Sequence, residues 1–151
     1  MSIAAGMDDF GVLLAGPGKA GVYHLNREPR EVARAAQSAG LDCFRIDIGR
    51  VHDKDDFLER ISKAMRFPDW FGRNWDALAD CLRDLSWLQG GGCVVVLEKA
   101  KHFAAGHRHE FDEAMDLLKE VSEYWRAEQR PFWVLVGGPE GWSPGLPPMP
   151  S

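Results

Sequence analysis

The sequence has few cysteines, no long apolar run and no excess of basic residues. Its three cysteines, Cys43, Cys81 and Cys93, are an odd number without the paired spacing of a metal motif, so we expect reduced, buried thiols. No stretch approaches the roughly 20 apolar residues of a membrane span. Asp8 and Asp9 precede the short apolar run near the start, which lacks a basic region and makes a poor signal peptide. These absences predict a cytoplasmic protein with no membrane partner.

The charge balance argues against direct nucleic-acid binding. The 151 residues carry 18 Lys plus Arg against 23 Asp plus Glu, a formal net charge of −5. A nucleic-acid binder normally presents a basic surface, whereas an acidic protein repels phosphate and favours basic protein surfaces. The length is that of one domain with one core, and we expect a monomer.

Strand patterns and helix patterns alternate along the chain. The segments expected as strands are 21–25, 43–48, 93–97 and 132–136, and those expected as helices are 28–39, 53–65, about 74–85, a short one from about 101, and 110–128. The segments CVVVL and FWVLV are apolar throughout, as in strands that are covered on both faces. The sequence therefore predicts an α/β fold, a layered parallel sheet of about four strands flanked by helices.

The composition divides the chain into three parts. Residues 1–20 mix small residues with Gly and Pro and are expected to be an irregular N-terminal arm, either mobile or lying over the domain. Residues 21–138 form the single domain, in which 21–42 are an N-terminal strand and helix extension. Residues 139–151 are rich in Pro and Gly, and we expect this tail to be disordered or to lie along the surface.

One expected helix carries an acidic stripe. Asp76, Asp80 and Asp84 recur every four residues beside an apolar stripe, and Asn74 is the expected N-cap. Like charges at this spacing destabilise a helix by about 0.2–0.5 kcal/mol per pair. The stripe is either an ordinary solvated face or a surface for a basic partner.

The turn before this helix favours the second interpretation. Trp70, Phe71 and Gly72 place two aromatic residues and a flexible one beside the acidic stripe. Aromatic anchors next to a focused charge are typical of protein-binding hot spots. The alternative is that one or both rings fill the core.

The run 67–82, FPDWFGRNWDALADCL, closely resembles the acidic-helix region of the barstar family, intracellular inhibitors of secreted ribonucleases. The residues that carry the resemblance are Pro68, Asp69, Trp70, Phe71, Gly72, Asn74, Asp76, Ala77, Leu78, Asp80, Cys81 and Leu82. The order of expected elements also agrees from about Phe44 to Val136. The resemblance implies a barstar-like fold and a non-enzymatic immunity protein without cofactor or metal.

The resemblance also implies how a barnase-like extracellular or toxin ribonuclease would be bound. The acidic helix and its preceding turn would occlude the enzyme's active site and stand in for RNA phosphates. Asp80 would enter the phosphate pocket, and Asp76 would pair with basic residues of the enzyme. Trp70 and Phe71 would occupy the aromatic positions of the turn, with backbone and amide contacts from Gly72 and Asn74.

The sequence departs from the family pattern at three places. Ala79 stands where a tryptophan is expected, Arg83 stands where a small hydroxyl residue is expected, and about the first 40 residues have no counterpart. A changed contact aromatic and an added positive charge would alter specificity, so the expected nuclease is not barnase itself. A further acidic contact is expected from Glu120 or Glu123 on the long helix, and the sequence does not choose between them.

The sequence leaves two other functions open. The first is a barstar-fold interaction or regulatory module that binds another basic protein without nuclease inhibition. The second is a small hydrolase or metal-dependent enzyme that uses His102, His107 and His109 with Glu98 or Glu110. No established zinc spacing is met, and the run 16–19 (GPGK) lacks the spacing of a phosphate loop. We therefore expect neither a metal site nor catalysis.

Overall fold

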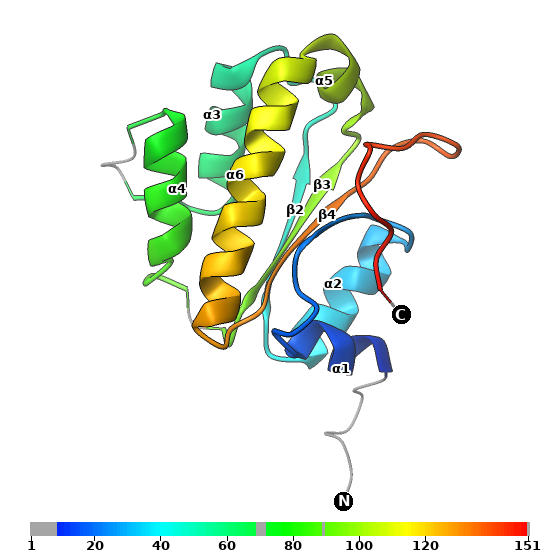
Figure 1. Cartoon of the computed structure of the whole chain (residues 1–151), viewed down its shortest axis with the longest axis vertical. Helices are drawn as coiled ribbons and strands as arrows, with labels where there is room; N and C mark the ends of the chain where they lie inside the picture. Colours follow the sequence, from blue (N-terminus) through cyan, green and yellow to red (C-terminus); the bar gives the residue numbers. More distant parts are fainter. Residues whose placement is uncertain (1–8, 69–71, 89, 151) are drawn as a thin grey trace, which may run out of the picture.

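The protein folds into a three-layer α/β structure, seen in a computed structural model that describes residues 9–68, 72–88 and 90–150 (Figure 1). Its elements, in chain order, are α1 (Asp9–Ala15), β1 (Val22–His24), α2 (Pro29–Ser38), β2 (Asp42–Asp47), α3 (Lys54–Ala64), α4 (Trp75–Asp84), β3 (Cys93–Glu98), α5 (Lys101–Gly106), α6 (Arg108–Ala127) and β4 (Phe132–Val136). The alternation of strands and helices expected from the sequence is confirmed.

The sheet has four parallel strands in the order β1-β4-β3-β2. The two central strands are β3 and β4, paired so that Val94 lies beside Trp133 and Val95 beside Val134. Successive side chains of a strand point to opposite faces of the sheet, so these pairs mark the two faces. The α/β fold with a parallel sheet of about four strands is confirmed.

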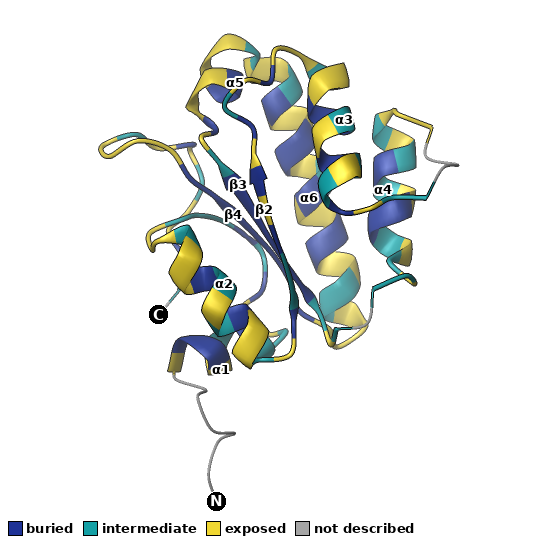
Figure 2. Cartoon of the chain, turned by 180° about the vertical axis from the view of Figure 1, so that it is seen from behind, coloured by how far each residue is buried: buried dark blue, intermediate teal, exposed yellow. Residues whose placement is uncertain are grey.

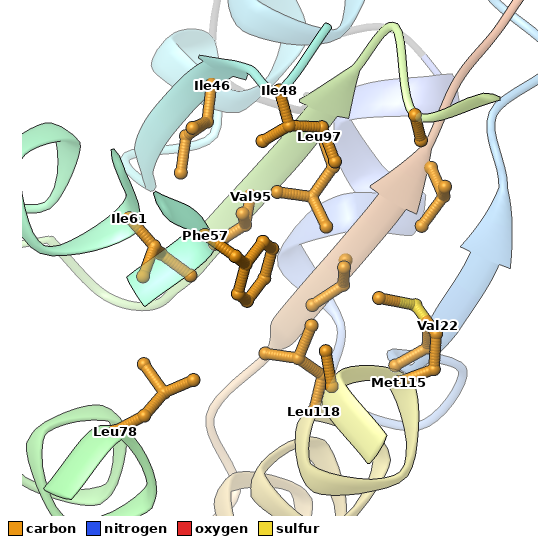
Figure 3. Packing of buried hydrophobic residues seen from close by; sticks show 14 of the residues in the cluster. Val22, Ile46, Ile48, Phe57, Ile61, Leu78, Val95, Leu97, Met115 and Leu118 are labelled. Carbon is orange, nitrogen blue, oxygen red and sulfur yellow. The ribbon is translucent and has the colours of Figure 1, made fainter. Parts of the chain in front are cut away.

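One face of the sheet packs against α3, α5 and α6. Val95, Leu97 and Val134 from the strands meet Phe57 of α3 and Leu118 of α6 in one cluster of buried side chains, part of which Figure 3 shows. Helix α4 lies farther out, next to α6 (Figure 1). The helix that carries the acidic stripe is therefore supported by other helices and not by the sheet.

The opposite face packs against α1, α2 and the C-terminal tail. Val94, Val96 and Trp133 from the strands form a second buried cluster with Leu14 of α1 and Val32 of α2. In Figure 2, α2 shows a buried inner stripe and an exposed outer one. Because both faces are covered, β3 and β4 need apolar residues at every position, which explains their continuous apolar sequences.

The expectation of an irregular arm over residues 1–20 is wrong for residues 9–15, which form α1. Phe10 and Leu14 lie one helical turn apart and are 5% and 0% exposed. A seven-residue helix is unstable by itself, so α1 forms because tertiary packing stabilises it. The Trp133 indole N–H also donates a buried 2.9 Å hydrogen bond to the Leu14 carbonyl and fixes α1 on the sheet.

The Pro- and Gly-rich tail lies against the domain. The His24 amide donates a 2.7 Å hydrogen bond to the Pro147 carbonyl, and Met149 is buried in the second cluster. Of the two alternatives for the tail, the structure shows the one along the surface. β1 pairs with β4, so the N-terminal extension enlarges the sheet.

Two further observations concern burial and membranes. Tyr124 of α6 is a large aromatic residue that is 41% exposed. Within the described ranges, none of the helices is both long and apolar enough to span a bilayer.

The contact between Trp133 and Leu14 yields a stability prediction. Trp133→Phe removes the indole N–H, so the Leu14 carbonyl loses its buried hydrogen bond from residue 133. We expect the free energy of unfolding to fall by about 2–4 kcal/mol, measured by urea denaturation followed by circular dichroism. Trp142→Phe, at a half-buried ring of the tail, serves as the control and should cost less. Equal losses would contradict the role of Trp133 in fixing α1.

Candidate functional site

The acidic stripe lies on α4, whose start is fixed by a side-chain cap. Asn74 has extended backbone angles, and its Oδ1 accepts a 2.7 Å hydrogen bond from the Ala77 amide. Asp76 follows in the first turn, where the helix dipole favours a carboxylate. The helix ends at Leu85, which adopts a left-handed conformation with φ of 44°. The expected N-cap is confirmed.

The inner face of α4 is firmly anchored. Leu78 and Leu82 are fully buried, and the Trp75 ring lies 6.1 Å from the Phe57 ring of α3. Near the end of the helix, the Trp125 indole N–H of α6 donates a 2.7 Å hydrogen bond to the Leu82 carbonyl. This bond satisfies a last-turn carbonyl that has no partner within the helix. α4 is therefore held at both ends, with its polar face outward.

A shallow groove of about 630 Å³ runs between α4 and α6. Its lining residues are Trp75, Asp76, Ala79, Asp80, Arg83, Glu113, Asp116, Leu117 and Glu120. Five of these residues carry a carboxylate and one carries a guanidinium group. We call this surface the acidic groove. The structure thus places two acidic stripes, one from each helix, along the same groove.

The carboxylates of the acidic groove are largely unpaired. Among the described side chains, no cation lies within 4.0 Å of Asp76, Asp80, Asp116 or Glu120. Glu113 is 3.7 Å from His109 Nε2, a contact that is an ion pair only when the imidazole is protonated. Unpaired charges of one sign on two facing helices add their potentials and attract a basic partner.

The structure brings together four of the residues singled out from the sequence. Asp76, Ala79, Asp80 and Arg83 all line the acidic groove. Gly72 and Asn74 are exposed and precede the first turn of α4, but they do not line the groove. Trp70 and Phe71 lie outside the described residues. Asp84, the third residue of the acidic stripe, is exposed and is not among the lining residues.

The second wall of the groove was only partly expected. Glu120 lines the groove and Glu123 does not, so of the two only Glu120 shares this surface with Asp76 and Asp80. Glu113 and Asp116 were missed by the sequence analysis. Their spacing with Glu120, three and then four residues, places all three on one stripe of α6. That spacing was a usable signal, but only the packing of α6 against α4 shows which stripe faces the groove.

The cysteines are unpaired, and burial makes their thiols weak acids. Desolvation, together with the charges of Asp84 and Asp80, raises the pKa of the Cys81 thiol to about 11. Burial also raises the pKa of Cys93 well above its ordinary value, and that of Cys43 to about 11. Cys81 and Cys93 are buried as expected, but Cys43 is partly exposed. None of the three has the lowered pKa of a nucleophilic thiol.

The histidine segment does not assemble a metal site. His107 Nδ1 lies 3.7 Å from Glu110 within one turn of α6, and the His102 ring lies 6.2 Å from the His52 ring. Over the described part of the chain, no three His, Cys, Asp or Glu side chains are grouped as metal ligands would be.

Comparison with known families matches residues 41–137 to the family described as Barstar (barnase inhibitor). The match covers more than half of the chain and contains β2 to β4, α4 and the acidic groove. The chain belongs to the barstar family. Family members are inhibitors and not enzymes. The resemblance found in residues 67–82 is thus confirmed, and the elements before β2 and the tail lie outside the match.

The remaining comparisons concern individual proteins. The curated proteins contain no match to this chain. Among solved structures, the ORC2 protein of Aeropyrum pernix, in its ADPNP-ADP complexes, matches with a TM-score of 0.53 and 16% sequence identity. The match covers 84% of this chain but 37% of that chain, so this chain spans little more than a third of its length. At this identity the likeness shows a shared fold alone.

The cap of α4 yields a testable prediction. Asn74→Ala removes the acceptor for the Ala77 amide and should lower the free energy of unfolding by about 1 kcal/mol. Asn74→Asp keeps an acceptor oxygen and should change it by less than about half as much. Thermal unfolding of both variants measures the difference. Equal destabilisation would show that the cap does not hold the start of the helix.

Proposed function

We propose that the protein is a non-enzymatic inhibitor of a small basic ribonuclease and that it binds this enzyme through the acidic groove. The observation that carries the proposal is a set of four carboxylates that lie along one groove without an ion pair to a described side chain. Asp76 and Asp80 come from α4, and Asp116 and Glu120 come from α6. Membership of the barstar family supports a protein partner of this kind.

The chemistry of a ribonuclease explains why such a groove would bind it. An enzyme that holds phosphodiesters presents Arg, Lys or His in its active site. A carboxylate fixed on an anchored helix occupies the same positions as a phosphate oxygen, and it cannot be cleaved. Association should be fast and should slow with added salt, because the groove steers a basic partner from a distance.

Ala79 and Arg83 set the specificity within this proposal. Both residues line the groove, so a large partner side chain can enter beside Ala79, and Arg83 repels a cation at its end of the groove. The partner is therefore a nuclease whose basic face leaves a gap, or carries an acidic group, opposite Arg83.

The direct test compares Asp80→Ala with Asp84→Ala. Both remove one carboxylate from the same helix, but only Asp80 lines the groove. We expect Asp80→Ala to weaken inhibition of the nuclease by about 2–5 kcal/mol, as is usual when a buried charge pair loses one partner. Asp84→Ala should stay within about threefold of the unchanged protein, since a rim charge contributes little. Titration of ribonuclease activity against each variant measures both. Equal inhibition by the two variants would reject the role of Asp80.

The second wall is tested on α6 in the same way. Glu120→Ala should weaken binding and lower the association rate, whereas Glu123→Ala should do neither, because only Glu120 lines the groove. The rates are measured by stopped-flow mixing at low and high salt. A dependence on Glu123 and not on Glu120 would place the contact on a different face of α6.

The function itself has a separate test. Purified protein is added in stoichiometric amount to ribonucleases recovered from bacterial culture supernatants, and RNA cleavage is followed. Proteins that bind to the chain are identified from the same supernatants. If the chain binds a basic protein but inhibits no nuclease, it is an interaction module and the inhibitor proposal is rejected.

A further inference from the structure

A second cavity, larger than the acidic groove, takes in His102 and Glu98. It lies at the carboxyl ends of the parallel strands and has a volume of about 1410 Å³. Its lining comes from the segments after the strands and from α5, and it includes Leu25, Glu28, Lys101, His102, Gly137 and Glu140. We call it the strand-end crevice. It shares no lining residue with the acidic groove.

The topology of the sheet creates this crevice. After β1 the chain continues into α2 on one face of the sheet, whereas after β3 it continues into α5 and α6 on the other face (Figure 1). The end of β4 lies between β1 and β3. In open parallel sheets, the point where connections diverge to opposite faces is where small molecules bind.

Small and apolar residues form the base of the crevice. A Cβ on Gly137 would come within 3.0 Å of the Leu25 side chain, and one on Gly138 would collide with the Trp142 ring. The glycines therefore allow the loop after β4 to pack closely and leave the space above it open. Pro29, Ala105 and Pro139 add apolar surface.

Half of the ionisable side chains that line the crevice are already in ion pairs. Arg27 pairs with Glu31 at 2.9 Å, Glu98 pairs with Arg45 at 2.6 Å, and Lys99 pairs with Asp47 at 3.3 Å. Among the described residues that line the crevice, four remain without an ion pair. They are Lys101 and His102 at the start of α5, Glu28 before α2, and Glu140 after β4.

The remaining charges have a definite arrangement. The basic groups come from the α5 side, and the carboxylates come from the loops after β1 and β4. A polyphosphate would meet the carboxylates, and a simple cation would meet the lysine. A ligand with one charge of each sign and an apolar body satisfies both sides.

We propose that the strand-end crevice binds a short peptide with free termini, two to four residues long. The peptide carboxylate lies against Lys101 and His102, its ammonium group lies against Glu28 and Glu140, and its apolar side chains lie over Leu25 and the prolines. The volume is larger than a single amino acid fills and leaves room for such a peptide. This site is separate from the proposed nuclease surface and does not depend on it.

The test uses the tripeptide Ala-Phe-Ala and its N-acetylated and C-amidated forms. Each is titrated into the full ¹⁵N-labelled chain, and backbone amide shifts are recorded. We expect saturable shifts at Asn26, Ala105, Gly137 and Gly138 with the free tripeptide. Each blocked form should bind about fivefold more weakly, because it loses one charged end. No saturable shift at these amides would overturn the proposal.

Two variants assign the ends of the peptide. Lys101→Gln should weaken the free tripeptide about fivefold but leave the C-amidated form unchanged, and Glu28→Gln should do the same with the N-acetylated form. Lys119→Gln, an exposed lysine on α6 outside the crevice, is the control and should change neither. If Lys101→Gln weakened both peptides equally, the pairing with the carboxylate would be wrong. Nuclease inhibition should be the same in all three variants, which separates this site from the acidic groove.

Discussion

The structure depends on the burial of two strands on both faces. β3 and β4 have no polar side chain between Val94 and Leu97 or between Phe132 and Val136, and all of these residues are buried. Such strands are unstable unless helices cover the sheet twice. The layer of α3, α5 and α6 covers one face, and α1, α2 and the tail cover the other. The N-terminal extension is therefore part of the core, and its loss would expose Val94, Val96 and Trp133 to water.

The same packing leaves the outer face of α4 open to solvent. Because α6 already covers the sheet, α4 buries only its inner stripe, through Leu78 and Leu82, and keeps Asp76 and Asp80 in solvent. Carboxylates spaced four residues apart repel each other and cost helix stability. The Asn74 cap and the Trp125 hydrogen bond offset that repulsion at the two ends of the helix. These contacts stabilise α4, so the helix can carry a pattern of like charges that would destabilise it by itself.

Strong local patterns made much of the fold predictable, and the exceptions share a physical cause. The continuous apolar strands and the amphipathic helices were identified because their periodicity is a property of the chain alone. α1 was missed because a seven-residue helix exists only through its contacts with Trp133 and α2. Only the α4 wall of the acidic groove could be predicted in full, because the α6 wall also depends on tertiary contacts. Asp76 and Asp80 could be identified on one helix, but the orientation of Glu113 and Asp116 depends on how α6 packs against α4.

The two surfaces of the molecule have different structural origins. The acidic groove lies wholly within residues 41–137, the part of the chain that matches the barstar family. The strand-end crevice takes one wall from residues 25–31, which precede that match and lead into α2. No residue of this wall lines the acidic groove. A change in the extension can therefore alter the lining of the crevice without changing a residue of the acidic groove. A change in the packing of α6 acts differently, because α6 supports α4 and also packs against the sheet beneath both surfaces.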